Sequence, residues 1–278
     1  IPLMRGEHIS RTIESLVGEA KNLAKSGVKE LILIAQELTY YGLDLYKKRA
    51  LDELLFALNE VEGIEWIRLH YAYPSKFPLE ILDAIQKCDK VCNYLDIPFQ
   101  HANDNVLKRM RRQVTREEQT ILIGQIRDKV PNIAIRTTML VGFPGETDEE
   151  FEDLCDFVRE IQFERLGVFT YSHEENTSAH QYEDDIPEEL KQERAQILMG
   201  IEEEIACEKN SQKVGQICKV LIDRKESGNY VGRTEFDSPE VDNEVLIPTK
   251  GNYLRIGDFA QIEIVDATEF DLYGTLVK

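Results

Sequence analysis

The sequence has little that would support a membrane, secreted or fibrous protein. No apolar run approaches the roughly 20 residues that a membrane-spanning helix needs, and no hydrophobic signal segment is present. The five cysteines are odd in number and scattered, which is typical of reduced thiols. With only 16 glycines and 9 prolines, the composition also excludes collagen-like and low-complexity chains. We therefore expect a globular protein of the cytoplasm.

Metal-binding motifs are also missing. Cys88 and Cys92 form a C-x3-C pair, but the third thiolate of an iron–sulfur loop would fall at position 95, which is Leu95. No zinc-type spacing of cysteine and histidine occurs. We interpret Cys88 and Cys92 as structural and expect no metal ligands in this chain.

Positive charge is scarce. The chain has 33 basic and 52 acidic residues, a net charge of −19 that is spread along its length. Such a surface repels phosphate backbones, so RNA is a disfavoured partner, although a local basic groove is not excluded. A basic protein is the partner that this charge favours.

From residue 9 to about 200 the hydrophobic pattern alternates between strand and helix periods. Five strands separated by helices imply a parallel sheet with right-handed crossovers. The chain begins just before a helix, so we expect a sixth strand upstream, which is too few for a closed eight-fold barrel. The predicted fold class is α/β, an open partial (β/α)6 barrel of the TIM type with its chemistry at the C-terminal strand ends. The five strands are predicted at 30–36, 66–71, 91–97, 133–141 and 165–171.

The last quarter of the chain has a different hydrophobic pattern. A long charged helix at 188–210 precedes short β-rich runs separated by glycine and asparagine. Five such runs predict a small antiparallel barrel of the OB type. We expect one domain at 1–211 and this second one at 212–278. The runs lie at 216–225, 230–236, 244–248, 259–265 and 272–277.

The sharpest local signal is the turn Gly142-Phe143-Pro144-Gly145-Glu146, between a predicted strand and a predicted helix. Its glycines allow a close backbone approach to a ligand, and the N–H groups of the following helix favour an electron-rich group. Thr147 and Glu150 form a capping box for that helix. An ordinary strand-to-helix turn would need the same glycines, but the strand-end position favours a functional one.

Polar residues also follow the other predicted strands. Individually these residues fit helix caps or structural hydrogen bonds. Because the ends of parallel strands meet at one edge, together they predict a single polar mouth. They are Gln36, Glu37 and Thr39, then His70 and Tyr71, then Gln100 and His101, and finally residues 169–172 with Tyr171.

Seven segments carry a family resemblance that extends over essentially the whole chain. They are IPLMRGEHISR at 1–11, LIAQELTYYGLDLY at 33–46, HYAYP at 70–74, YLDIPFQHANDNVLKRMRR at 94–112, IRTTMLVGFPGETDEEF at 135–151, VFTYSHEENTSA at 168–179 and DSPEVD at 237–242. Together they resemble the radical S-adenosylmethionine methylthiotransferases, in the branch that modifies an aspartate of a small-subunit ribosomal protein. Asn176 departs from this pattern, since the family usually has glycine there.

The resemblance implies S-adenosylmethionine and two 4Fe-4S clusters as cofactors. In that family IPLMRG follows the C-x3-C-x2-C loop of the radical-generating cluster, so all cluster ligands would precede Ile1, and this chain alone is expected to be inactive. The family's reaction uses a 5′-deoxyadenosyl radical to abstract a hydrogen from the aspartate β-carbon, which then receives a methylthio group. The second domain resembles the family's TRAM domain.

The resemblance also implies roles for the strand-end residues. Gly142, Phe143, Pro144, Gly145 and Glu146 would lie by the adenine, and Gln36, Glu37 and Thr39 by the methionine amino group. Gln100, His101 and Arg136 would lie near the ribose or the carboxylate, with Tyr171 lining the mouth.

Two alternatives remain open. One is the related methylthiotransferase that modifies tRNA, and the other is a non-catalytic binding scaffold. DIPFQH, RTTMLVGFPGET and YSHEE favour the protein-modifying branch, as does the charge. A basic small-subunit ribosomal protein is then the expected partner, and the candidate contacts are Asp237, Glu240, Asp242, Asp266, Glu269 and Asp271.

Overall fold

The computed structural model describes residues 6, 8–175 and 177–277, so residues 1–5 of the IPLMRG motif and Asn176 lie outside the described residues. Its first part is an α/β unit, as predicted. The elements of this unit are α2 (Ile13–Lys25), β1 (Glu30–Leu33), η1 (Leu38–Tyr40), α3 (Leu51–Asn59), β2 (Trp66–Leu69), α4 (Glu80–Lys87), β3 (Val91–Asp96), α5 (Asp104–Arg109), α6 (Arg116–Lys129), β4 (Ala134–Val141), α7 (Asp148–Ile161), β5 (Arg165–Thr170), η2 (Ala179–Gln181) and α8 (Glu188–Ser211).

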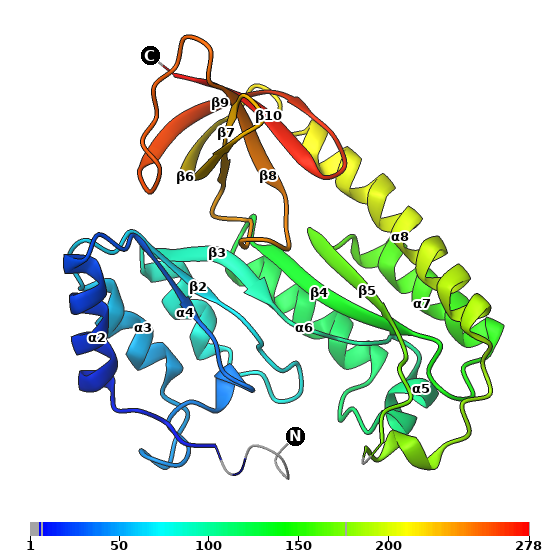
Figure 1. Cartoon of the computed structure of the whole chain (residues 1–278). Coiled ribbons are helices and arrows are strands. Elements are labelled where there is room, and N and C mark those ends of the chain that lie inside the picture. Colours follow the sequence, from blue (N-terminus) through cyan, green and yellow to red (C-terminus); the bar gives the residue numbers. More distant parts are fainter. Residues whose placement is uncertain (1–5, 7, 176, 278) are drawn as a thin grey trace.

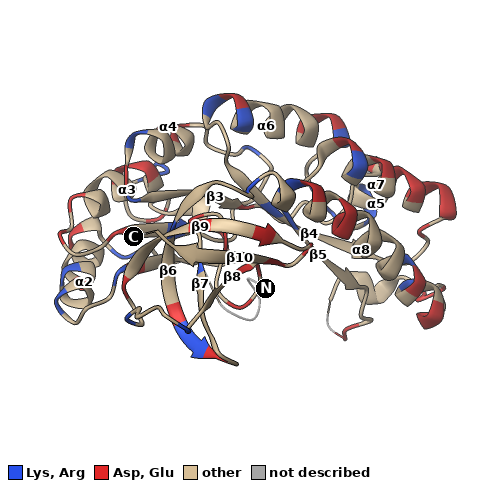
Figure 2. Ribbon diagram, turned by 90° about the horizontal axis from the view of Figure 1, so that it is seen from above, with Lys and Arg blue, Asp and Glu red and all other residues tan. Residues whose placement is uncertain are grey.

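The five strands form one parallel sheet in the order β1-β2-β3-β4-β5, which confirms the predicted parallel arrangement. The helices lie in an arc around one face of the sheet (Figure 2). The first strand ends at Leu33, three residues before the predicted end. It is shorter because the Glu37 side chain caps η1 and turns the chain away from the sheet.

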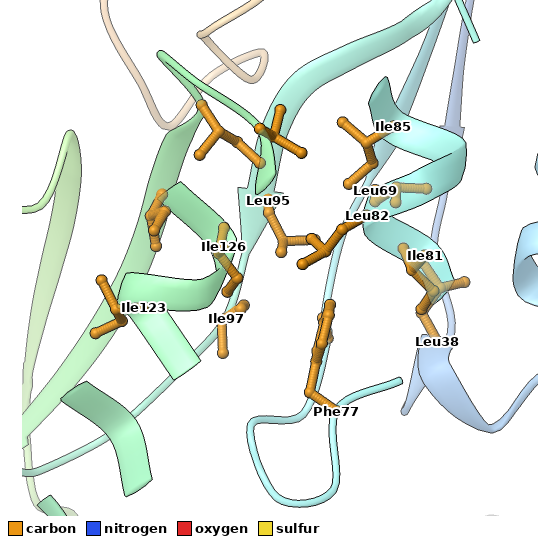
Figure 3. Close-up of a cluster of buried hydrophobic side chains, with 14 of the residues drawn as sticks. Leu38, Leu69, Phe77, Ile81, Leu82, Ile85, Leu95, Ile97, Ile123 and Ile126 are labelled. Atoms are coloured by element: carbon orange, nitrogen blue, oxygen red, sulfur yellow. The ribbon is translucent and has the colours of Figure 1, made fainter. Parts of the chain in front are cut away.

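The main core lies between the outer face of the sheet and the helices. On β2, Ile67 and Leu69 belong to this core, whereas Trp66 and Arg68 point to the inner face. Figure 3 shows Leu82 and Ile85 packed near Leu69 and Leu95, with Ile123 and Ile126 closing the cluster. Because successive side chains alternate along a strand, packing the outer face leaves the inner-face residues to line the hollow of the open barrel.

The second part of the chain is a closed five-stranded barrel of β6 (Ile217–Glu226), β7 (Asn229–Arg233), β8 (Glu244–Pro248), β9 (Phe259–Ala267) and β10 (Asp271–Leu276). Four neighbouring pairs are antiparallel, but β8 and β10 pair in parallel. Strand directions cannot alternate all the way around a ring with an odd number of members, so one parallel pair is unavoidable. The predicted OB-type barrel is thereby confirmed, with this one exception to its antiparallel pairing.

The small barrel stands over the inner face of the sheet, joined to it through α8 (Figure 1). Residues 234–243, here named the plug loop, connect β7 to β8 and enter the hollow near the N-terminal strand ends. Beside this loop, the Trp66 and Phe259 rings meet edge to face, with centroids 4.7 Å apart. The hollow is thus closed at the end opposite the predicted mouth.

Buried ion pairs hold the plug loop in place. Arg165 Nε donates to Asp237 Oδ1 at 3.0 Å, and both side chains are almost completely buried. Burial opposes the ionisation of Asp237, but Arg165 and Lys213 outweigh it and hold the pKa of this carboxyl below its usual range. The stabilisation is therefore present at neutral pH and is lost only when the pH falls far enough to protonate Asp237.

Two further buried groups extend this charged layer. Glu30 on β1 accepts from Arg68 and from Arg233, at 2.8 Å in each case, and so joins the sheet to the small barrel. Asp242 accepts from the Tyr94 hydroxyl at 2.7 Å and from Arg136 Nε at 3.2 Å.

The prediction that Asp237 and Asp242 contact a partner protein is therefore wrong. Both carboxylates form ion pairs with arginines inside the molecule. The sequence did not indicate these pairs, because the residues that contact this loop lie about 70 to 170 positions away in the chain. Glu240 and Asp266 are exposed, and Glu269 and Asp271 are partly exposed.

Cys88 and Cys92 are buried, and burial raises the pKa of Cys92 to about 12. Both thiols therefore fill space in the core, as expected. Among the described residues, no helix combines the length and the apolar character needed to cross a membrane.

We expect Asp237→Asn to lower the free energy of unfolding by about 3–5 kcal/mol, because it leaves Arg165 buried without a counter-ion. Chemical denaturation measures this, with Asp266→Asn, an exposed change of the same chemistry, as the control. The double variant Arg165→Met/Asp237→Leu should recover most of the loss. Equal stabilities for Asp237→Asn and Asp266→Asn would contradict the structural role of the pair.

Candidate functional site

The glycine turn after β4 is built around one buried carboxylate. Glu146 Oε2 accepts the N–H of Gly142 at 2.8 Å and that of Phe143 at 3.2 Å. Its other oxygen accepts from Arg194 Nη1 at 3.0 Å. Burial raises the pKa of Glu146 to about 7, although Arg194 and the two amides act in the opposite direction. The turn therefore has a fixed shape without any ligand.

His101 lies directly beneath this turn. Its Nδ1 accepts the N–H of Asn103 at 3.0 Å, so the proton of the neutral ring is on Nε2. That nitrogen is 3.9 Å from Glu146 Oε2 and has no hydrogen-bond partner among the described residues. Burial lowers the pKa of His101 to about 3, which keeps the ring neutral at physiological pH.

The outer part of the turn is held from two sides. The Gly145 N–H donates to Asp185 Oδ1 at 2.8 Å, and the Gly145 carbonyl accepts from Arg109 Nη2 at 3.2 Å. Arg109 is itself paired with Glu150, the capping-box residue of α7. The predicted capping box is present, with both of its reciprocal hydrogen bonds.

Both glycines of the turn have a positive φ, but the space around them differs. A Cβ on Gly142 would lie 2.4 Å from Lys191 Cγ, so α8 packs tightly against it. At Gly145 the nearest atom to such a Cβ is 4.0 Å away, and the position is exposed. The open space over Gly145 is where a ligand can approach the backbone.

Aromatic packing joins the turn to the end of β5. The Phe143 and Tyr171 rings meet edge to face, with centroids 5.3 Å apart, and Val106 lies in the same cluster. Tyr171 donates its N–H to the Val141 carbonyl, and Lys191 Nζ lies 5.3 Å from the Tyr171 ring centroid. Gln100 donates its N–H to the Thr138 carbonyl beside this cluster.

The residues after β1 form a separate group. Glu37 Oε1 accepts from the N–H and the hydroxyl of Thr39, at 2.9 and 2.6 Å, and from the N–H of Tyr73. Burial raises the pKa of Glu37, although these hydrogen bonds lower it. Gln36 is exposed. The carboxylate of Glu37 thus shapes the loop, and its neighbour Gln36 faces outward.

The structure brings some predicted site residues together and separates others. Gln100, His101, Tyr171 and the glycine turn share one side of the mouth, and the Gln36 group lies across the sheet at β1. Arg136 lies deeper, between Asp96 and Asp242, with 3.2 Å to each carboxylate.

Four charged residues that support the turn were not predicted from the sequence: Arg109, Asp185, Lys191 and Arg194. For Lys191 and Arg194 a signal exists, because they share a helix face with the buried Leu198. Charged residues in line with a core position indicate buried ion pairs, not solvent.

The mouth suits a polar organic ligand better than a metal. It offers a backbone turn with open space above it at Gly145. Within the described part of the chain, no group of three or more His, Cys, Asp or Glu side chains is placed to hold a metal ion. An iron–sulfur cluster at this mouth would therefore need ligands from outside these residues.

Comparison with known proteins assigns both parts of the chain to known families. Residues 2–158, more than half of the chain, match the radical SAM superfamily, and residues 214–277 match the TRAM domain. Coproporphyrinogen III oxidase (HemN) from Escherichia coli, a radical SAM enzyme, has a similar fold. Its TM-score is 0.56 with 18% identity, over 90% of this chain and 59% of that one.

Curated relatives are much more similar in sequence. The ribosomal protein uS12 methylthiotransferase RimO of Flavobacterium psychrophilum is 59% identical over 274 residues, which cover 99% of this chain and 63% of that protein. RimO of Bacteroides fragilis is 54% identical over 278 residues, 100% of this chain and 64% of that protein. The chain thus spans less than two thirds of the length of these relatives. From the superfamily match and the fold that accompanies it, the chain belongs to the radical SAM superfamily.

Proposed function

We propose that this chain is part of a radical S-adenosylmethionine methylthiotransferase that adds a methylthio group to an aspartate of ribosomal protein uS12. The observation that carries the proposal is 51–59% identity to RimO proteins over nearly the whole chain. We propose that it acts in the cytoplasm and is divided into domains at 1–211 and 212–278.

The mouth residues are proposed to hold S-adenosylmethionine, which supplies a carbon-centred radical when a 4Fe-4S cluster reduces it. The exposed backbone at Gly145 would lie against the adenine, and Gln36 would reach the amino group. Glu37 and Thr39 would act by shaping their loop, because the carboxylate already accepts hydrogen bonds from Thr39 and Tyr73. The residues after β1 and the glycine turn would thus bind opposite ends of one molecule.

His101 and Glu146 would act as positioning residues. Both are buried under the turn, and Glu146 fixes the backbone amides of Gly142 and Phe143. His101 would support the turn from below, where its Nε2 lies 3.9 Å from Glu146 Oε2. Arg136 would influence the ribose or carboxylate through its charge, which Asp96 and Asp242 partly neutralise. Tyr171 would close the side of the mouth.

The partner is proposed to be basic, with RNA contact disfavoured. The chain carries a net charge of −19, and acidic residues are prominent along α7 and α8 (Figure 2). A cationic ribosomal protein would be attracted over a Debye length of about 8 Å at physiological ionic strength. A phosphate backbone would be repelled over the same range.

We expect residues 1–278 alone to bind no stoichiometric iron–sulfur cluster, because the five thiols lack cluster geometry. Anaerobic reconstitution followed by iron and sulfide quantification measures this, with the full-length protein as the positive control. Four irons retained per copy of this chain would overturn the structural role given to Cys88 and Cys92.

We expect Gly145→Val to weaken S-adenosylmethionine binding to the cluster-loaded full-length protein by roughly tenfold, about 1.4 kcal/mol. The added side chain fills the ligand's approach and is also strained at φ +74°. Gly145→Asn separates the two effects, since asparagine tolerates a positive φ. Gly251→Val, at φ +81° with no atom within 4 Å of its Cβ, is the matched control. Normal affinity in a folded Gly145→Val protein would place the ligand elsewhere.

We expect the full-length protein to methylthiolate an aspartate of uS12 when supplied with S-adenosylmethionine, a reductant and a sulfur source. Peptide mass spectrometry locates the modified residue, and a tRNA pool offered under the same conditions is the comparison. Modified tRNA with unmodified uS12 would move the protein to the tRNA-modifying branch. Modification of neither substrate would favour the binding scaffold.

A further inference from the structure

A groove separate from the mouth lies between the edge strand β5, helix α8 and two loops of the small barrel. Its volume is about 510 Å³. Of the residues assigned to the mouth, only Arg136 lines it. The β5 residues in the groove are Arg165 to Val168, at the end of the strand that faces the small barrel. At about 3.3 Å per residue, the groove is roughly 13 Å from Tyr171 along β5.

The groove is lined by seven carboxylates and two guanidinium groups. Both guanidinium groups already have carboxylate partners: Arg165 pairs with Asp237, and Arg136 pairs with Asp96 and with Asp242 of the groove. Five of the carboxylates have no ion-pair partner among the residues that the structure describes. These five are Glu202, Glu203, Glu240, Glu269 and Asp271.

Glu202 is the group that indicates a ligand. Its residue is only 5% exposed, it lines the groove, and its Oε2 has no hydrogen-bond partner in the described structure. Burial raises the pKa of Glu202 to about 8, although Arg165 acts to lower it. A cation that enters the groove would favour the ionised form of Glu202 and would give its unpartnered oxygen a donor.

The other acidic groups are crowded at the opposite wall. Burial raises the pKa of Asp271, and the neighbouring Glu244 and Glu269 raise it further. Like charges repel, and of these three acidic residues only Glu244 has an ion-pair partner, Arg224, among the described residues. Both walls of the groove, one on α8 and one on the small barrel, therefore carry acidic residues that a cationic ligand would stabilise.

The groove also has an apolar rim. Val241 is 56% exposed and Phe270 is 50% exposed, and Met199 contributes from α8. Lysine and arginine side chains combine an apolar stem with a cationic end, so they match a rim of this kind with carboxylates at its base. A phosphate backbone would meet only repulsion there.

We propose that this groove binds an extended, lysine- or arginine-bearing segment of a protein partner, with one cationic side chain seated on Glu202. Under the proposed function that partner is uS12, and the identification of the partner rests on that proposal. Because the groove and the mouth both border β5, one substrate segment would span them with about four residues between the two contacts. The groove would thus help to select the substrate.

The test uses the full-length protein and two probes, an octalysine peptide and uS12. A water-soluble carbodiimide joins lysine amines directly to carboxylates, and peptide mass spectrometry then identifies the linked residues. We expect links to concentrate on the groove carboxylates. In equilibrium binding we expect the triple variant Glu202→Gln/Glu269→Gln/Asp271→Asn to lose about tenfold in affinity for both probes.

The matched control is Glu62→Gln/Asp128→Asn/Glu193→Gln, which makes the same kinds of substitution at three exposed acidic residues outside the groove. It should lose less than about twofold in affinity. Both triple variants should keep the parent's melting temperature, because the groove variant removes crowded like charges and not an ion pair.

The outcomes separate this proposal from the proposed function. If octalysine binds in the groove and uS12 does not bind, the groove is a site for cationic segments but uS12 is not its partner. The opposite result is that uS12 is methylthiolated, the crosslinks are spread over the surface, and both triple variants bind with equal affinity. That result would contradict the proposed groove and leave the proposed function standing. Groove carboxylates that stay unlinked in the full-length protein, because another segment of it covers them, would also overturn the inference.

Discussion

The contact on which the rest of the structure depends is the buried charged layer between the plug loop and the inner strands. An open sheet leaves its inner face unpacked, and polar side chains there would face water unless something covered them. Arg165 with Asp237, and Glu30 with Arg68 and Arg233, allow a loop of the small barrel to cover one end. Burying charges in this way is tolerable only because each has a partner with good geometry.

This closure has a direct effect on the mouth. With the plug loop against the N-terminal part of the strands, the polar loops of the described residues gather at the other end of the hollow, where the strands end. The glycine turn at that opening is stiff, since Glu146 satisfies two of its amides and Arg109 and Asp185 hold its outer part. Ligand binding then needs little reorganisation of the chain, which reduces its entropic cost.

Much of this could be predicted from the sequence, because local patterns determined it. The buried apolar runs gave the parallel strands, and the Thr147 and Glu150 spacing gave the start of α7. The plug loop could not be predicted, since nothing in DSPEVD shows that Asp237 lies against Arg165. The same limit hid the part played by Arg194, whose partner Glu146 lies 48 residues away in the chain. Long-range ion pairs have no periodicity, so they become visible only once the fold is known.

Helix α8 connects these two regions mechanically. It has 24 residues and is therefore about 36 Å long, and it is held at both ends. In its first two turns, Arg194 donates to Glu146 beneath the glycine turn. Near its end, Asn210 donates to the carbonyls of Thr268 and Glu269 in the small barrel. Because α8 contacts both regions, a tilt of the small barrel would act on the same helix that holds Arg194 against Glu146.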